Sequence, residues 1–263
     1  MSAPSRDYSL LDVAPTAARV LGLTLPKSDG RPIEPVEGWG CRNVLIIVID
    51  SLGYDLLLWL LPRLHGMRSL AEEGMLLRAE AVASHTTPAI ATILSGLLPE
   101  NHGILDKAGA KESSILSIPE IASESGLRSG VIMESNGAEV YEGLIEIVGG
   151  IPDHIPPEEF DRRACSMTLE AISQHPRLLV SYFIGIDKAA HDGKDAGEIR
   201  EAAMRIDGCI SEIAGMADED TLLILCGDHP IHAGRLKRCS SPYSVALILA
   251  RGRGGKDSAP VLR

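Results

Sequence analysis

The sequence predicts an α/β fold, a three-layer α/β/α sandwich around a mostly parallel sheet, formed as a single domain over residues 1–263. Three observations predict it. Short apolar runs rich in β-branched residues alternate with stretches of helical periodicity. The apolar runs lack polar alternation, as expected for strands buried on both faces. The chain of 263 residues is long enough for one large domain of this class.

The predicted strands with the clearest pattern end in carboxylates. Residues 43–49, 178–186 and 221–227 run directly into Asp50, Asp187 and Asp228. Because the carboxyl ends of parallel strands meet at one edge, where ligands bind in open α/β sheets, we expect the three aspartates to gather there.

Three histidines follow these aspartates closely: His191, His229 and His232. Carboxylate oxygen and imidazole nitrogen are ligands that zinc-type divalent cations take, and three of each are enough for two ions. The sequence therefore predicts a metal site at this edge.

The remaining elements follow from periodicity and from breaker residues. Pro15 fits the first turn of a helix over residues 9–23, and Pro62 splits a leucine-rich helix over residues 55–73. A proline near the start and a glycine at the end bound a helix over residues 88–96. We also expect helices over residues 118–125, 158–174 and 196–216, and strands over residues 75–83, 128–133 and 244–250. Residues 139–148 are ambiguous, and residues 149–157 are expected to form a loop.

Composition limits the classes of partner. A net charge of −11 and an aromatic content of 3% argue against binding of duplex nucleic acid, but not against a small phosphorylated substrate. No apolar run is long enough to cross a bilayer. The five cysteines are scattered, so we expect reduced thiols and a cytoplasmic protein. The sequence does not indicate an oligomeric state.

A cluster of hydroxyl side chains precedes the helix that begins near Pro88. Free N–H groups at a helix start attract anions, so a hydroxyl at Thr86 that also binds a metal ion could attack phosphorus. The alternative is that Thr86 or Thr87 is only a helix N-cap.

Four motifs, taken together, resemble the alkaline phosphatase superfamily, in particular its type I phosphodiesterase and nucleotide pyrophosphatase branch. They are Val-Ile-Asp50; Thr86-x-Pro88 with the segment from Thr92 to Gly103; Asp187-x-x-x-His191; and Asp228-His229. The resemblance covers roughly residues 43–250.

The resemblance implies two divalent ions, usually zinc, with manganese or magnesium as alternatives. It implies that Asp50, Thr86, Asp228 and His229 surround one ion. It implies that Asp187, His191 and His232 hold the other. Thr86 corresponds to the family's nucleophile.

The chain departs from this branch at three positions in the motifs, one of which is Ala190, at a common glycine position before His191. Ala89 stands where the branch has an asparagine that supports the phosphate, which leaves His85 and Asn101 as candidate substrate-binding residues. Pro230 replaces a glycine after Asp228-His229.

A further departure concerns the order of the chain. Residues 9–33 resemble a segment that many members carry after their last core strand. We infer a circular permutation and expect this segment to pack near the last strand.

The resemblance implies a metal-dependent phosphoester hydrolase, either a phosphodiesterase/nucleotide pyrophosphatase or a phosphomonoesterase, that forms a phosphothreonine intermediate. Two alternatives remain: a phosphomutase of the same superfamily, or a binding protein that keeps the metal scaffold with weakened catalysis.

Overall fold

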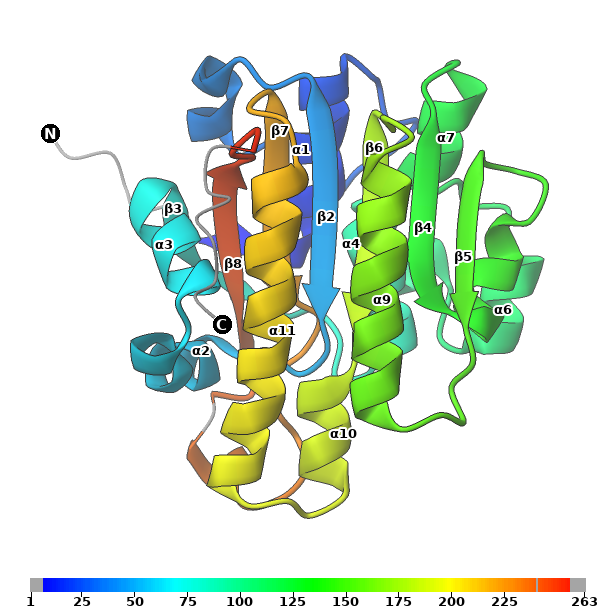
Figure 1. The fold of residues 1–263 in the computed structure, drawn as a ribbon. Helices are drawn as coiled ribbons and strands as arrows, with labels where there is room; N and C mark the ends of the chain where they lie inside the picture. Colours follow the sequence, from blue (N-terminus) through cyan, green and yellow to red (C-terminus); the bar gives the residue numbers. More distant parts are fainter. Residues whose placement is uncertain (1–6, 240, 256–263) are drawn as a thin grey trace, which may run out of the picture.

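A computed structural model describes residues 7–239 and 241–255, which form an eight-stranded sheet in the order β1-β3-β8-β7-β2-β6-β4-β5 (Figure 1). The strands are β1 (Tyr8–Ser9), β2 (Asn43–Ile49), β3 (Met75–Glu80), β4 (Ser129–Glu134), β5 (Ile147–Ile151), β6 (Leu178–Phe183), β7 (Thr221–Gly227) and β8 (Ser244–Arg251). Among these, β8 alone runs antiparallel to its neighbours, β3 and β7. The predicted mostly parallel α/β fold is confirmed.

Helices cover both faces of the sheet, which gives the three layers (Figure 1). One face carries α9 (Pro157–Ile172) and α11 (Ala196–Met216), and the other carries α1 (Val13–Leu21), α4 (Thr86–Ser95) and α7 (Ile118–Glu124). The other α-helices are α2 (Tyr54–Leu60), α3 (Gly66–Glu73), α5 (Pro99–His102), α6 (Lys107–Glu112), α8 (Ser135–Ala138) and α10 (Gly185–His191). Short 3-10 helices span Leu10–Asp12, Glu34–Trp39, Leu61–Arg63, Glu139–Tyr141 and Leu236–Cys239.

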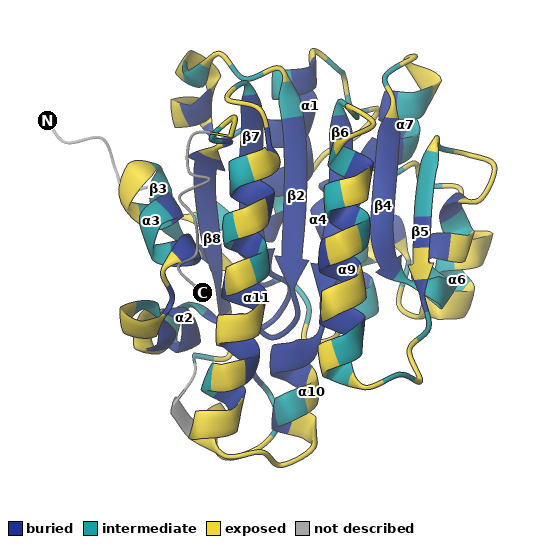
Figure 2. Ribbon diagram, in the orientation of Figure 1, coloured by how far each residue is buried: buried dark blue, intermediate teal, exposed yellow. Residues whose placement is uncertain are grey.

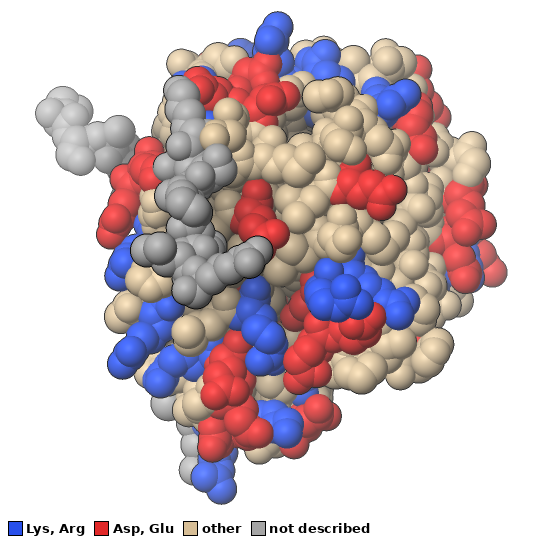
Figure 3. Space-filling view, viewed as in Figure 1, with Lys and Arg blue, Asp and Glu red and all other residues tan. Residues whose placement is uncertain are grey.

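The outer helices are amphipathic, as their sequence spacing predicts. Ile199, Ala203, Ile206 and Ile210 of α11 recur on one face of the helix and are buried, while the opposite side faces solvent (Figure 2). On this side of the molecule basic and acidic side chains lie intermingled, not gathered into one basic surface (Figure 3).

The register of the central strands positions the site. Ile49 of β2 lies opposite Gly227 of β7 and Phe183 of β6. The next residues, Asp50 and Asp228, therefore leave neighbouring strands at the same level. Gly227 permits this packing because a Cβ there would lie 2.2 Å from the carbonyl oxygen of Leu52.

Two local predictions needed correction, and a third was confirmed. The strand expected over residues 178–186 ends at Phe183, so Asp187 lies in the first turn of α10 instead of at a strand end. Residues 147–151 form an edge strand, which takes in part of the ambiguous segment and part of the expected loop. The split at Pro62 is confirmed, since α2 and α3 are separate helices.

The N-terminal segment joins the sheet on the same side of β2 as β8. Tyr8–Ser9 pairs with β3, which lies between β1 and β8, and α1 contacts β2 and α4. Asp29 donates its backbone N–H to the carbonyl oxygen of Gly96 at the end of α4 (2.8 Å). The inferred circular permutation stays a prediction.

Candidate functional site

Two buried carboxylates, one histidine and one threonine hydroxyl meet where β2 and β7 end. His229 Nε2 lies 3.3 Å from Asp50 Oδ1, 3.5 Å from Asp228 Oδ2 and 3.3 Å from Thr86 Oγ1. Four potential ligand atoms thus surround one small region. The structure brings together the four residues that the resemblance implied for one ion.

The donor set fits a divalent cation. Asp50 Oδ1 and Asp228 Oδ2 are buried and accept no hydrogen bond from any residue that the structure describes. An unpaired buried carboxylate oxygen is costly, and a bound cation would satisfy both oxygens at once.

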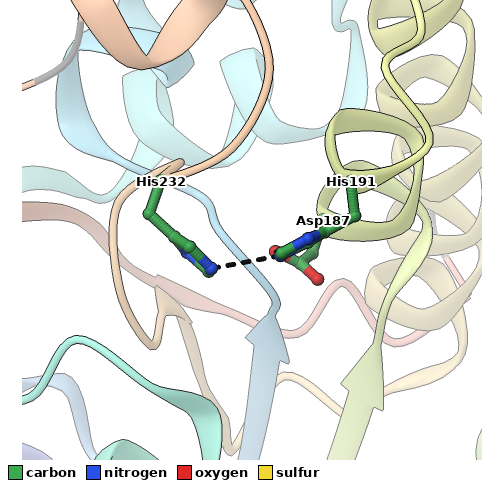
Figure 4. A group of neighbouring side chains, drawn as sticks. All are labelled: Asp187, His191 and His232. Carbon is green, nitrogen blue, oxygen red and sulfur yellow. Dashed lines mark hydrogen bonds and ion pairs between the residues drawn. The ribbon is translucent and has the colours of Figure 1, made fainter.

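A second group lies beside the first and contains Asp187, His191 and His232 (Figure 4). Asp187 and His191 are one helical turn apart on α10, and His232 reaches them from the loop after β7. His191 Nε2 is 3.5 Å from Asp187 Oδ1 and 3.1 Å from His232 Nε2. These residues fit a second cation.

The two groups are not fully separate. Asp50, Asp187 and His229 also place ligand atoms within 4.8 Å of one another. Asp187 therefore belongs to both groups, and the assignment of these residues to two distinct ions remains a prediction.

Burial makes it unfavourable for Asp50 and Asp228 to carry negative charge side by side. Burial, followed by the charges of Asp228 and Asp187, raises the pKa of Asp50 well above its usual range. Burial also raises the pKa of Asp228, and burial together with the neighbouring His229 lowers the pKa of His232. A cation would favour the charged carboxylates and the neutral imidazoles that coordination requires.

Thr86 is the first residue of α4. The N-cap position is occupied by His85, whose side chain makes no capping hydrogen bond. Pro88 has no N–H and the N–H of Ala89 donates to the His85 carbonyl oxygen (3.2 Å), so the backbone N–H groups of Thr86 and Thr87 are the ones available to an anion here. The interpretation of Thr86 or Thr87 as an N-cap is wrong.

Two residues of the site were not predicted from the sequence, Ser51 and Tyr182. Ser51 Oγ donates to Asp187 Oδ1 (2.8 Å), and its N–H donates to Asp228 Oδ1 (3.1 Å). The Tyr182 hydroxyl donates to Asp50 Oδ2. For Ser51, its position directly after Asp50 was the available signal. Tyr182 is the fifth of six residues in the buried strand β6, where nothing in the sequence marks it as a site residue.

The structure separates the two predicted substrate-binding residues. The His85 ring centroid is 6.4 Å from that of His232, at the edge of the metal-ligand groups. Asn101 lies near the opposite end of α4, where its Nδ2 donates to Asp29 Oδ2 (2.7 Å). The ten residues of α4 span about 15 Å, so Asn101 is not brought to Thr86. The methyl group of Ala89 is fully buried.

Another buried carboxylate holds α10 in place. Asp161 of α9 accepts the N–H groups of Ile184 (2.9 Å) and Gly185 (3.1 Å) through its two oxygens. A Cβ at position 185 would lie 2.2 Å from Asp161 Oδ2, which explains the glycine. These contacts fix the first turn of the helix that carries Asp187 and His191.

Comparison with known families agrees with the motifs. Residues 44–109 match the family model of the type I phosphodiesterases and nucleotide pyrophosphatases. No curated protein matches the chain in sequence. The match covers the first two of the four motifs, those of Asp50 and Thr86, and confirms the resemblance there.

Solved structures show the fold. A phosphonoacetate hydrolase from Sinorhizobium meliloti 1021 superposes with a TM-score of 0.60 at 14% identity over 72% of this chain and 56% of that one. A protein of the alkaline phosphatase superfamily from Vibrio parahaemolyticus superposes with a TM-score of 0.56 at 15% identity. The match covers 80% of this chain and 60% of that one. Murine ectonucleotide pyrophosphatase/phosphodiesterase 5 superposes with a TM-score of 0.54 at 18% identity. The match covers 72% of this chain and 57% of that one.

The fold is therefore that of the alkaline phosphatase superfamily. The chain spans a little more than half of the length of the phosphonoacetate hydrolase. Within the described residues, no helix is both long and apolar enough to cross a membrane.

Proposed function

We propose that this chain is a metal-dependent phosphoester hydrolase in which Thr86 is the nucleophile. The observation that carries the proposal is the position of Thr86 Oγ1. It lies 3.3 Å from His229 Nε2 at the uncapped start of α4, beside two buried carboxylate oxygens that lack hydrogen-bond partners. The family match at residues 44–109 supports the same chemistry.

Each residue has a definite task in this proposal. Asp50, Asp228 and His229 hold one divalent ion, and Asp187, His191 and His232 hold the other, with zinc as the expected metal. When bound, such ions lower the pKa of a nearby hydroxyl and neutralise charge on the phosphate oxygens. The N–H groups at the start of α4 hold the phosphate in position for Thr86.

In the reaction Thr86 Oγ1 gives up its proton and forms a bond to phosphorus. The bond from phosphorus to the departing oxygen breaks, and that oxygen takes up a proton to leave as an alcohol. The product is a phosphothreonine, which water then hydrolyses to phosphate or a phosphomonoester and free Thr86. Backbone N–H donors at the start of α4 stand in for the amide that Ala89 does not provide.

The proposal is tested by turnover of p-nitrophenyl phosphate and bis-p-nitrophenyl phosphate by zinc-, manganese- and magnesium-loaded protein. Thr86→Ala should lower kcat by about a thousandfold or more, since loss of a nucleophile is rarely compensated. Thr87→Ala is the matched control, because it removes the next hydroxyl of the same helical turn and should cost far less.

Two outcomes would contradict the proposal. Full activity in Thr86→Ala would remove the nucleophile assignment. Bound metal without turnover of either ester would favour the alternative of a binding protein with a metal scaffold. A phosphomutase would instead transfer the phosphoryl group between two positions of one substrate without net release of phosphate.

A further inference from the structure

A cavity of about 110 Å³ opens beside Thr86 and follows α4 away from the metal-ligand groups. Its wall on α4 consists of three pairs of residues, Thr86/Thr87, Ile90/Ala91 and Leu94/Ser95. The spacing of four places the pairs on one face of the helix. From Thr86 to Ser95 this face is about 13 Å long.

The opposite wall comes from α6, β4, α8 and the segments around them, and it is mainly apolar. Its apolar members are Ile104, Ala110, Ile115, Met133, Val140 and Tyr141. Such a surface favours an organic group that has few hydrogen-bonding atoms.

The charged residues of the cavity neutralise one another or are held by neighbours. Lys107 Nζ lies 3.1 Å from Glu134 Oε1. Glu120 Oε2 accepts the Ser117 hydroxyl (2.7 Å). Burial raises the pKa of Tyr141 to about 12, so its hydroxyl stays neutral. Within the described residues, the cavity therefore offers a ligand no unpaired cation. Its one carboxylate without an ion-pair partner, Glu120, has Oε2 engaged by the Ser117 hydroxyl.

We propose that this cavity binds the uncharged, apolar organic group of the phosphoester substrate, an aryl or short branched alkyl group. This proposal rests on the proposed function, because it places the phosphate of the same molecule at the start of α4. The volume is comparable to that of an apolar cavity of about 150 Å³ that binds benzene. A sugar would leave its hydroxyl groups against apolar side chains, which is unfavourable.

The test compares phenylphosphonate with methylphosphonate by isothermal titration of the metal-loaded protein. The two share the phosphonate group and differ in the organic group alone. Phenylphosphonate should bind about tenfold more tightly or better, as expected for burial of a ring. Dissociation constants that agree within about twofold would overturn the proposal, since a buried ring must contribute more than that.

Variants locate the binding. Ala110→Leu, which fills the cavity from α6, should remove most of the preference for phenylphosphonate. Ala91→Phe should do the same from α4, and both are checked for folding by their melting temperature. Ala108→Leu is the matched control, since Ala108 is an exposed residue of α6 outside the cavity. A preference that survives both cavity variants would overturn the proposal.

The two proposals can fail separately. Turnover of phosphoesters without a preference for phenylphosphonate would remove the cavity assignment alone. Preferential binding of phenylphosphonate that Ala110→Leu abolishes, in a protein without any turnover, would support the cavity and remove the hydrolase.

Discussion

The hydroxyl of Ser51 donates a hydrogen bond to Asp187 at 2.8 Å and joins the end of β2 to helix α10. Ser51 has a φ of 63°, which a non-glycine residue adopts at some cost in energy. The same hydroxyl is 3.3 Å from His229 Nδ1. One strained residue thus orients a carboxylate and an imidazole that we assign to metal binding.

Loss of this hydroxyl should weaken metal binding. We expect Ser51→Ala to lower zinc affinity about 10- to 100-fold, as loss of a hydrogen bond to a ligand usually does. Competition with a chromophoric chelator measures the change. Ser51→Gly removes the same hydroxyl but relieves the backbone strain, so it should lose similar affinity while unfolding at a higher temperature than Ser51→Ala. Zinc affinity equal to that of the wild type in both variants would remove this role.

Divalent metal should stabilise the folded protein. Asp50 Oδ1 and Asp228 Oδ2 are buried without hydrogen-bond partners, so a bound cation should favour the folded state. Zinc at about 100 times its dissociation constant should then raise the free energy of unfolding by about 2.7 kcal/mol, as expected for a ligand that binds one site of the folded protein alone. Thermal unfolding with EDTA and with zinc measures the difference. In Asp228→Asn the zinc-dependent rise should shrink, and the metal-free protein should become more stable because one buried charge is gone. A melting temperature that zinc does not change would contradict the assignment.

The second group of ligands should account for one of two ions. His191→Ala removes an imidazole that lies 3.1 Å from His232, and we expect the zinc content to fall from about two ions per chain to about one. Elemental analysis after gel filtration gives the count. His154→Ala is the matched control, since His154 is exposed and lies outside both groups. Two ions in His191→Ala would show that this histidine is not needed as a ligand.

The stability of the protein should depend on the protonation of Asp161. Burial raises the pKa of this carboxyl from 3.8 to about 7. The hydrogen bonds from the backbone N–H groups of Ile184 and Gly185 lower the pKa in part, as does the charge of Arg205, whereas the charge of Glu158 raises it. The folded protein therefore binds this proton more tightly than the unfolded chain. The contribution to stability is fully present below pH 3.8 and is lost as the pH rises through about 7.

Asp161→Asn tests this dependence, because an amide does not titrate in this range. The stability of the wild type relative to Asp161→Asn should fall by a few kcal/mol between pH 4 and pH 7, at about 1.4 kcal/mol for each unit of pKa shift. Urea unfolding across this pH range, with EDTA present, measures the difference. A difference that does not vary with pH would show that Asp161 keeps an ordinary pKa.

The central part of the site was predictable because the carboxylates directly follow apolar strands, and the carboxyl ends of parallel strands meet at one edge of the sheet. Asp50 and Asp228 each follow a buried apolar strand, and the parallel pairing of Ile49 with Gly227 brings them side by side. Asp187 was predicted to reach the same edge, but the position of the strand end was wrong. The apolar run continues past Phe183 into α10, and apolar residues alone do not distinguish the end of a buried strand from the start of a buried helix.

Other features depend on contacts between distant segments and could not be predicted. Asn101 was assigned to the phosphate, but its amide binds Asp29, which lies 72 residues earlier in the chain. The cavity next to Thr86 is formed partly by α6 and α8, for which no element was predicted from the sequence. Ser51 and Tyr182 became visible as site residues only through their hydrogen bonds to Asp187 and Asp50.

Helix α4 is secured at its far end by the N-terminal segment. Asp29 donates to the carbonyl oxygen of Gly96 and accepts the N–H of Leu98 (2.8 Å). The attachment of residues 9–33 therefore determines how accurately the hydroxyl of Thr86, at the other end of α4, is positioned. A protein shortened by these residues would be expected to lose its reactivity even where its sheet stayed intact.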